Sequence, residues 1–288
     1  MELKYIATRD GRLSSFLKEE MRISTGLMNK LKWQDKIFVN GIPRHTDFAV
    51  KAGDVVTVPL DEPAPEYPAE PGELTVLYED DHILAVDKPA GMLIHPSRAT
   101  MTGTLANRVV AYYEKTGQKS AFHPITRLDR DTFGIVLLAK NAHVHALLGE
   151  LHSQGTLRKT YEALTYGGPI EEEGIIDAPI ARRPLPSLLR YVNQEGKPSV
   201  TEFSVLERGD KWCRLSLKPI TGRTHQLRVH CAYMGFPILG DPQYGNKESL
   251  AYSCEKVIKT QLLCAKKLEF THPITGEKLC LQSNMTVK

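Results

Sequence analysis

The amino-acid sequence predicts an α+β protein with a mixed, largely antiparallel central sheet and flanking helices, preceded by a small N-terminal helical and β domain. Two observations lead to this prediction. Strand-like and helical segments follow one another in an irregular order with few crossover helices, whereas a doubly wound fold places a helix after each strand. A proline-rich stretch also separates the first 60 residues from the rest of the chain.

The composition is that of an ordinary folded protein. The chain has 288 residues, of which 41% are apolar and 25% are charged, and its formal net charge is +3. One or two domains with a large core are therefore expected, and the overall charge does not by itself indicate nucleic-acid binding. The five cysteines show no zinc or redox spacing, so we expect free thiols in a reducing compartment. We expect no signal peptide and no membrane span, and thus a cytoplasmic protein.

Residues 61–73 are predicted to form a linker. The stretch 59–71 holds five prolines and four acidic residues, with no basic residue. Because proline fixes φ and lacks a backbone N–H, such a stretch joins a helix or sheet poorly and favours an extended, semi-rigid segment. We therefore predict one domain at 1–60 and a second at 74–288.

The first 60 residues predict two short helices followed by strands. Apolar residues recur at helical spacing over Leu13–Met21, and a serine-threonine pair at 24–25 can cap a second helix. Strand-like runs follow at 36–42, which ends in an Asn-Gly turn signal, and at 54–58. The segment holds ten Lys/Arg against seven Asp/Glu. For charge alone, a solvated helix surface without a ligand is the simpler interpretation.

The second domain predicts alternating strands and helices. We expect strands at 74–78, 82–86, 134–139, 160–166, 202–207 and 212–218, and helices at 104–115, 141–153 and 224–234. Glycines follow the last two of these helices, where glycine commonly ends a helix.

A cluster of charges stands directly before a buried strand. Residues 126–134 read Thr-Arg-Leu-Asp-Arg-Asp-Thr-Phe-Gly and lead into the apolar run 135–139. Carboxylates beside a core are costly unless they are paired, and an arginine within reach keeps a carboxylate ionised and oriented. A nucleophile or general base requires such a carboxylate. The structural alternative is a salt-bridged turn that stabilises the strand entry.

Two further segments offer polar groups. The run 221–230 reads Thr-Gly-Arg-Thr-His-Gln-Leu-Arg-Val-His and predicts a polar helix start on which His225 and Arg228 share one face. A basic helix packed by its apolar residues would explain the same run. Tyr161 follows two cations at the start of a strand, which suits stacking on an unpaired base. Half-buried packing in a sheet is the alternative for a single tyrosine.

Taken together, these motifs resemble the RluA-type pseudouridine synthases over residues 74–288. The matching stretches are YEDDHILAVDKPAG at 78–91, RLDRDT at 127–132 with the glycine at 134, KTY at 159–161, KPITGRTHQLRVH at 218–230 and PILGD at 237–241. The N-terminal pattern of two helices, a VNG turn and a closing GDVV strand resembles the small RNA-binding domain of ribosomal small-subunit protein four, which is common in this family.

The resemblance implies an enzyme that isomerises specific uridines in structured ribosomal or transfer RNA to pseudouridine, with no cofactor and no metal. It implies Asp129 as the catalytic carboxylate, Arg228 as the arginine that pairs with it, and Tyr161 as the aromatic residue that stacks on the uracil and assists removal of its C5 proton. Further RNA or substrate contacts are expected at Arg127, Arg130, Arg223, His225, Gln226, Leu262 and Leu263. Arg127 is expected to occupy the space that the uridine vacates, and the two leucines are expected to line the pocket floor.

Three positions depart from the family pattern. Residues 24–26 read Ser-Thr-Gly where the RNA-binding domain often carries a Ser-Arg pair. Thr126 stands where a histidine often precedes the Arg-Leu-Asp sequence, and Phe133 stands where a small residue usually follows the threonine. The sequence leaves open whether Asp129 attacks C1′ or removes the 2′-proton, and which RNA is modified.

Three other functions fit parts of the pattern. A non-catalytic RNA-binding or ribosome-assembly factor would keep the basic N-terminal domain without needing Asp129, Arg228 and Tyr161 together. A uracil-removing glycosylase would use a similar carboxylate but release free base. An enzyme for small nucleosides would show little of the salt dependence that RNA contacts bring. We expect RNA as the partner, no membrane, no obligate protein partner and a monomer.

Overall fold

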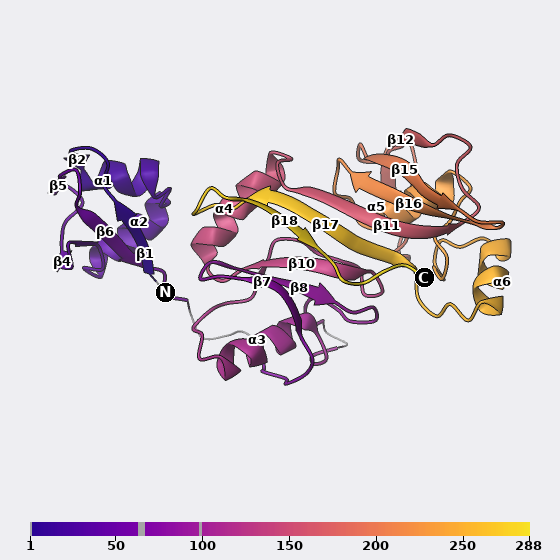
Figure 1. Cartoon of the computed structure of the whole chain (residues 1–288), viewed down its shortest axis with the longest axis horizontal. Coiled ribbons are helices and arrows are strands. Elements are labelled where there is room, and N and C mark those ends of the chain that lie inside the picture. The colour runs from indigo at the N-terminus through magenta and orange to yellow at the C-terminus, as the bar shows by residue number, and fades with distance from the viewer. Residues whose placement is uncertain (1, 63–66, 98–99) are drawn as a thin grey trace.

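The computed structural model describes residues 2–62, 67–97 and 100–288, and it places them in a small N-terminal unit and a larger unit beside it (Figure 1). The small unit gathers its own apolar core from residues between Leu3 and Leu60. The two units are in contact, because Ile274 packs against this first core and Arg22 forms an ion pair with Glu150 of the larger unit. Of the predicted linker 61–73, residues 63–66 lie outside the described residues.

A four-stranded sheet of order β1-β6-β3-β4 and two helical segments build the N-terminal unit. The first predicted helix begins as α-helix and continues as a π-helical turn, and Ser24 caps the second helix by accepting a hydrogen bond from the backbone N–H of Leu27 at 3.2 Å. The elements are β1 (Glu2–Ile6), β2 (Gly11–Arg12), α1 (Leu13–Ser15), η1 (Phe16–Glu20), α2 (Thr25–Trp33), β3 (Phe38–Val39), β4 (Ile42–Pro43), β5 (Ala49–Val50) and β6 (Val55–Pro59).

A ten-stranded sheet runs through the larger unit in the order β12-β15-β16-β11-β17-β10-β8-β7, with β18 beside β17 and β9 beside β10. The pair β10–β17 is parallel, and the other described pairs of this sheet are antiparallel, which confirms the predicted mixed, largely antiparallel sheet. Its strands are β7 (Thr75–Glu79), β8 (Ile83–Lys88), β9 (His123–Pro124), β10 (Phe133–Ala139), β11 (Arg158–Tyr166), β12 (Glu173–Asp177), β15 (Val200–Arg208), β16 (Trp212–Pro219), β17 (Leu263–Thr271) and β18 (Lys278–Gln282).

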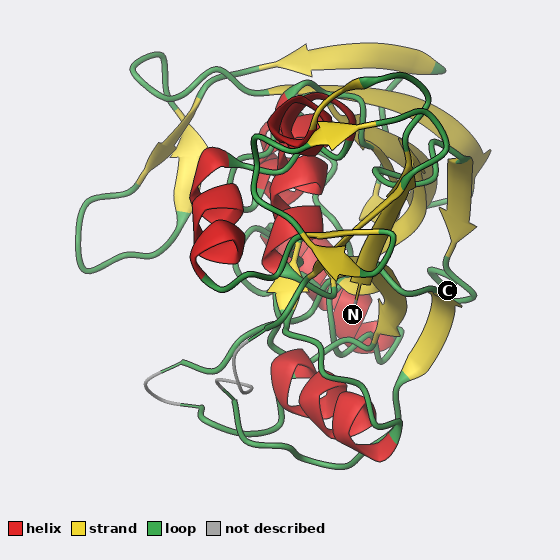
Figure 2. Ribbon diagram, turned by 90° about the vertical axis from the view of Figure 1, so that its left-hand side faces the viewer, coloured by secondary structure: helices red, strands yellow, loops and turns green. Residues whose placement is uncertain are grey.

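The helices of the larger unit are α3 (Leu105–Lys115), α4 (Ala142–Ser153), α5 (Gln226–Tyr233) and α6 (Lys247–Glu255), and a separate hairpin is formed by β13 (Ile180–Arg182) and β14 (Arg190–Val192). Strands β8 and β10 are buried along their whole length. Alternate residues of these strands belong to two different cores, one shared with α4 and the other with α3. The two helices therefore cover opposite faces, and α3 lies below the sheet in both views (Figures 1 and 2).

The large sheet has two halves, one formed by β7, β8 and β10 and the other by β17, β11, β16, β15 and β12. Gly134 lies where they meet, at the start of β10. Its φ is +105°, and a Cβ built on it would lie 2.4 Å from the carbonyl oxygen of Ala265 in β17. Any larger residue would push β10 away from β17. Because the loop 126–132 leads directly into this junction, the contact places the predicted catalytic segment at the line where the two halves meet.

Helix α5 lies under the other half of the sheet, where Leu227 and Cys231 pack on β11, β15 and β16. The predicted helix at 224–234 begins later than expected, at Gln226, because His225 adopts a left-handed conformation with φ +58°. All five cysteines are unpaired, as predicted. None of the helices in the described ranges is long and apolar enough to cross a lipid bilayer.

Candidate active site

The loop 126–132 is held by buried contacts on both sides of Asp129. Thr126 accepts a hydrogen bond from the backbone N–H of Leu137 through its hydroxyl at 3.0 Å. Gln261 donates to the hydroxyl of Thr132 at 2.5 Å, and Leu128 packs against the cores of both halves of the sheet. These anchors hold the backbone that carries Asp129, whose own side chain is 29% exposed.

Lys88 binds the backbone of the same loop from its buried side. The lysine is fully buried at the end of β8, and its ammonium donates to the carbonyl oxygens of Pro89, Met92 and Arg130 at 2.9, 2.8 and 2.9 Å. Burial lowers the pKa of Lys88 to about 8, while the charges of Asp131 and Asp129 oppose this shift. Since three N–H donors meet three carbonyl oxygens, the protonated form satisfies every partner.

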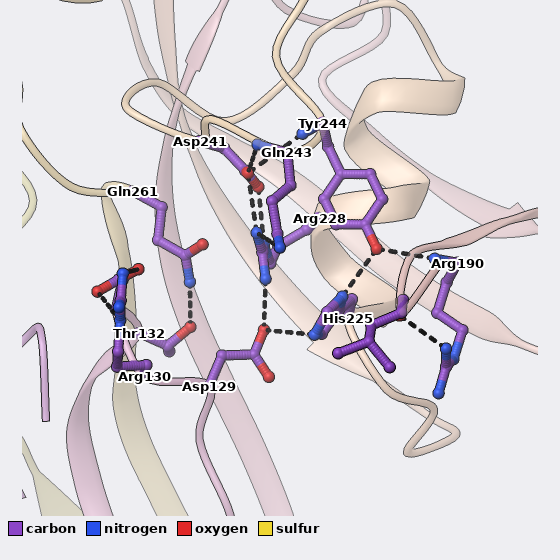
Figure 3. Close-up of polar contacts among 12 residues, drawn as sticks. Asp129, Arg130, Thr132, Arg190, His225, Arg228, Asp241, Gln243, Tyr244 and Gln261 are labelled. Atoms are coloured by element: carbon purple, nitrogen blue, oxygen red, sulfur yellow. Dashed lines mark hydrogen bonds and ion pairs between the residues drawn. The ribbon is translucent and has the colours of Figure 1, made fainter. Parts of the chain in front are cut away.

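Arg228 bridges two carboxylates that come from distant parts of the chain (Figure 3). Its Nη1 donates to Oδ2 of Asp129 at 2.9 Å, while its Nε and Nη2 donate to the two oxygens of Asp241 at 2.7 and 2.8 Å. A further bond at 2.7 Å joins Nη2 to Oε1 of Gln243. Burial opposes the charge of Arg228, but its bonds to Asp241 and Asp129 outweigh burial and raise its pKa.

Tyr161 lies on β11 at a register shift between β11 and β17. The side chain is 9% exposed and faces the cavity. Burial raises the pKa of Tyr161 above its ordinary value, and the negative charge of Asp129 adds to the shift. The phenol is therefore neutral at physiological pH.

A cavity of about 560 Å³ brings these side chains together. Its lining includes the predicted catalytic residues Asp129, Arg228 and Tyr161, and Leu263 at the start of β17. The volume is within the usual range of small-ligand sites and provides room for one nucleotide unit. A loop carboxylate, a helix guanidinium and a strand phenol therefore line one cavity.

Apart from His225, the other predicted contact residues fall into three groups. Arg127 and Arg223 are exposed and line the cavity, and Arg223 Nε also donates to the carbonyl of Pro198 at 3.1 Å. Gln226 lines the cavity but is buried, and its amide bonds to Thr221, Arg223, Val200 and Thr201 brace the turn before α5. Arg130 and Leu262 are not among the described residues that line the cavity.

The side chains of Arg130 and Leu262 point to other partners. Arg130 forms a bidentate ion pair with Asp131, with both bonds at 3.0 Å. Leu262 packs against the small core of Phe133, Cys264 and Val287.

His225 lines the cavity, with its Nε2 3.8 Å from Oδ2 of Asp129.

Asp241, Gln243, Tyr244 and Lys88 also belong to this site, although no role was predicted for them from the sequence. Asp241 belongs to the PILGD motif, so its position was visible but its partner was not. Gln243 and Tyr244 follow it in a turn, where Oδ1 of Asp241 accepts backbone N–H bonds from both at 2.9 and 3.2 Å. No spacing in the sequence predicts that Asp241 and Gln243 contact Arg228. Nor does any spacing predict that Lys88 contacts the loop 126–132.

Residues 82–233 match the family model described as RNA pseudouridylate synthase. The chain is 35% identical to the Bacillus subtilis protein called uncharacterized RNA pseudouridine synthase YjbO over 90% of each chain. It is 33% identical to ribosomal large subunit pseudouridine synthase C of Vibrio cholerae over 93% of this chain and 87% of that protein. The solved structure of human RNA pseudouridylate synthase domain containing 1 has a TM-score of 0.60 and 26% identity, covering 76% of this chain and 93% of the human chain.

Proposed function

The chain belongs to the RNA pseudouridylate synthase family, and from this premise we propose that Asp129, Arg228 and Tyr161 form its catalytic site. The family and its relatives establish the reaction, the isomerisation of uridine in RNA to pseudouridine. The observation that supports the site assignment is the ion pair of Asp129 and Arg228 within the cavity that Tyr161 also lines.

Asp129 supplies the negative charge that cleavage of the N1–C1′ bond requires. As this bond breaks, C1′ gains positive character, which a carboxylate can stabilise or trap. Arg228 donates a charge-assisted hydrogen bond to Oδ2 of this carboxylate and so holds it in place. The uracil then turns and rejoins C1′ through C5, with loss of the C5 proton and gain of a proton at N1. Either attack of Asp129 on C1′ or removal of the 2′-proton is compatible with this geometry.

Tyr161 is proposed to stack on the uracil and to take part in removal of the C5 proton. Because burial keeps the phenol neutral, the residue offers an aromatic face and an O–H donor in the free enzyme. A neutral phenol can accept the C5 proton only if it passes its own proton to another base. Asp129, whose charge already acts on Tyr161, is a suitable acceptor.

The RNA is proposed to lie over the exposed basic side chains at the cavity. Arg127 would fill the space left by the flipped uridine and so offset part of the unstacking cost of a few kcal/mol. Arg223 is exposed on the opposite segment and would bind a flanking phosphate.

Residues 1–60 are proposed to be an RNA-binding domain, joined through 61–73 to a catalytic domain at 74–288. Lys30 and Lys32 are exposed near the end of α2, beside Trp33, whose exposed fraction is 85%. Cations beside an exposed aromatic ring suit a backbone phosphate and a stacked base.

The substrate is proposed to be a uridine in ribosomal or transfer RNA. The name of the Vibrio cholerae relative refers to the ribosomal large subunit, which favours ribosomal RNA for this chain. We further propose that the enzyme is a monomer and acts in the cytoplasm. Light scattering of the purified chain would check the monomeric state.

The function is tested by mapping pseudouridines in all cellular RNA of strains with the gene, without it, and with the gene carrying Asp129→Asn. One or a few sites should disappear on deletion and return only with the unaltered gene. Return of the sites with the Asn variant would contradict the catalytic assignment of Asp129. Abasic sites in place of pseudouridine would point to a glycosylase, and an unchanged map to a non-catalytic RNA-binding factor.

A further inference from the structure

His225 occupies a constrained position at the start of α5. Its φ of +58° lies in the left-handed region that residues other than glycine rarely adopt. The side chain is 17% exposed and is turned toward the loop that carries Asp129 (Figure 3). A strained backbone that aims a histidine at a catalytic carboxylate suggests a role other than the RNA contact predicted from the sequence.

Tyr244 places its phenol oxygen within hydrogen-bond distance of His225. The backbone N–H of Arg190 in β14 donates to the phenol oxygen of Tyr244 at 3.0 Å, and the same oxygen lies 2.7 Å from Nδ1 of His225. Since that oxygen already accepts a bond from Arg190, its own proton is free to be donated to Nδ1. In the neutral imidazole the remaining proton is then on Nε2.

Nε2 of His225 faces Asp129. It lies 3.8 Å from Oδ2, the same oxygen that accepts the 2.9 Å bond from Arg228. Among the described residues, no hydrogen bond to Oδ1 of Asp129 is present. Arg228 thus donates to one oxygen of the carboxylate, His225 lies beside the same oxygen, and the other oxygen is left for the reacting sugar.

We propose that His225 is a positioning residue which, with its tautomer set by Tyr244, holds Oδ2 of Asp129 together with Arg228 and so directs Oδ1 at the ribose. This inference rests on the proposed catalytic role of Asp129. The separation of 3.8 Å is longer than a hydrogen bond, and catalytic contacts of this kind commonly close when the substrate enters. The link through Arg190 also connects the carboxylate to the β13–β14 hairpin.

The charges around His225 favour its neutral form. Burial lowers the pKa of His225, and the cations of Arg228 and Arg190 lower it further, against the raising effect of Asp129 and Asp241. Burial also raises the pKa of Tyr244, so the phenol keeps the proton that it donates. Both groups are therefore in the protonation states that the arrangement needs near neutral pH.

The test compares His225→Leu with His225→Gln in the full-length chain. Both residues meet the same left-handed backbone, but only glutamine places an N–H donor where Nε2 stands. Single-turnover tritium release would be measured on transcripts of large-subunit ribosomal RNA and of transfer RNA made with [5-³H]UTP. We expect the leucine variant to be about 10-fold to 100-fold slower with unchanged RNA affinity, as for loss of a residue that orients a catalytic ligand. Glutamine should restore most of the rate, and Tyr244→Phe should slow it without affecting affinity.

Equal rates for the Leu and Gln variants would overturn the inference. So would loss of RNA affinity in place of rate, because this would indicate the RNA contact predicted from the sequence. Asp129→Asn is run in parallel: full activity in that variant would refute the proposed function itself, whereas an inactive Asn variant with equal Leu and Gln rates would refute only the role of His225.

A second measurement avoids the risk that a variant misfolds. The ¹⁵N spectrum of imidazole-labelled wild-type protein reports which ring nitrogen carries the proton, and the His225 signal is the one missing in His225→Gln. We expect a proton on Nε2 and an acceptor at Nδ1. A proton on Nδ1 would overturn the inference.

Discussion

Arg228 Nη1 and Asp129 Oδ2 lie 2.9 Å apart, although the two residues are separated by 99 positions in the sequence. The same guanidinium binds both oxygens of Asp241, whose side chain is fully buried. Arg228 therefore serves as a rigid link between the loop before β10 and the turn after α5. A planar group with donors on several edges can make this connection, whereas a lysine ammonium has no equivalent geometry.

Asp129→Asn should abolish catalysis while leaving the fold intact. Asparagine keeps the shape of the side chain and can still accept a bond from Arg228, but it lacks the negative charge. We expect tritium release from [5-³H]uridine-labelled RNA to fall at least about 100-fold. The matched control is Asp131→Asn, two positions along the same loop, whose carboxylate pairs with the exposed Arg130. Similar losses in both variants would indicate damage to the loop rather than loss of a catalytic group.

Arg228→Lys should destabilise the protein as well as slow it. Lysine cannot bond Asp241 through two edges and still contact Asp129, so buried carboxylate oxygens lose their partners. We expect the free energy of unfolding in urea to fall by about 3 kcal/mol. Arg9→Lys is the control, since the ion pair of Arg9 with Glu19 is exposed at 51% and 61%, and it should change stability by no more than about 0.5 kcal/mol. An unchanged unfolding midpoint for Arg228→Lys would argue against the bridging role.

Lys88 should make stability depend on pH in a specific direction. Burial lowers its pKa to about 8 from 10.5, so between these values the unfolded chain holds a proton that the folded chain has released. The penalty for the buried charge is fully present below pH 8 and disappears as pH rises toward 10.5, which amounts to about 3 kcal/mol at most. Wild type should therefore gain stability relative to Lys88→Met between pH 7.5 and 9.5, as measured by urea unfolding. Parallel pH profiles would contradict the lowered pKa.

Lys88→Met should also lower the rate of catalysis. The carbonyl of Arg130, next to Asp129, loses its buried donor, and the loop becomes less well ordered. Turnover at saturating RNA is the measurement, and it should fall while RNA affinity is retained.

Removal of the two exposed lysines of α2 should weaken RNA binding without affecting chemistry. We expect Lys30→Ala with Lys32→Ala to raise KM, to leave kcat unchanged, and to reduce the slope of log affinity against log salt by about 1.4, as for two lost phosphate contacts on single-stranded RNA. Lys115→Ala with Lys119→Ala, at the exposed end of α3, provides a control of equal charge. If both pairs shift KM alike, only general charge is involved and not the N-terminal domain.

Much of the fold could be predicted because its signals are local. The apolar runs 83–86 and 135–139 indicate strands regardless of their neighbours, and the cap at Ser24 is read from residues within one turn. β12, β18 and α6 were not predicted, and only the family resemblance implied a strand at Leu262 and Leu263, where β17 begins. The apolar residues of these elements are interrupted by charged ones, and the pairing of the strands depends on partners far away in the chain. The start of α5 was placed too early because the left-handed turn at His225 has no local signal: glycine would have marked it, and histidine does not.

The sequence alone determined the chemistry that this chain carries. The Arg-Leu-Asp segment, the polar helix start and the tyrosine after two cations identify a family, because these residue types are recognisable in order without knowledge of their contacts. Only the tertiary structure decided which atoms meet. It shows that Arg228 joins Asp129 to Asp241 and that Lys88 binds the backbone of the loop 126–132. It also shows that Arg130 pairs with Asp131 and that Gln226 braces the turn before α5. The reason is physical, since hydrogen bonds and burial depend on separations of a few ångströms between segments that the linear order places far apart.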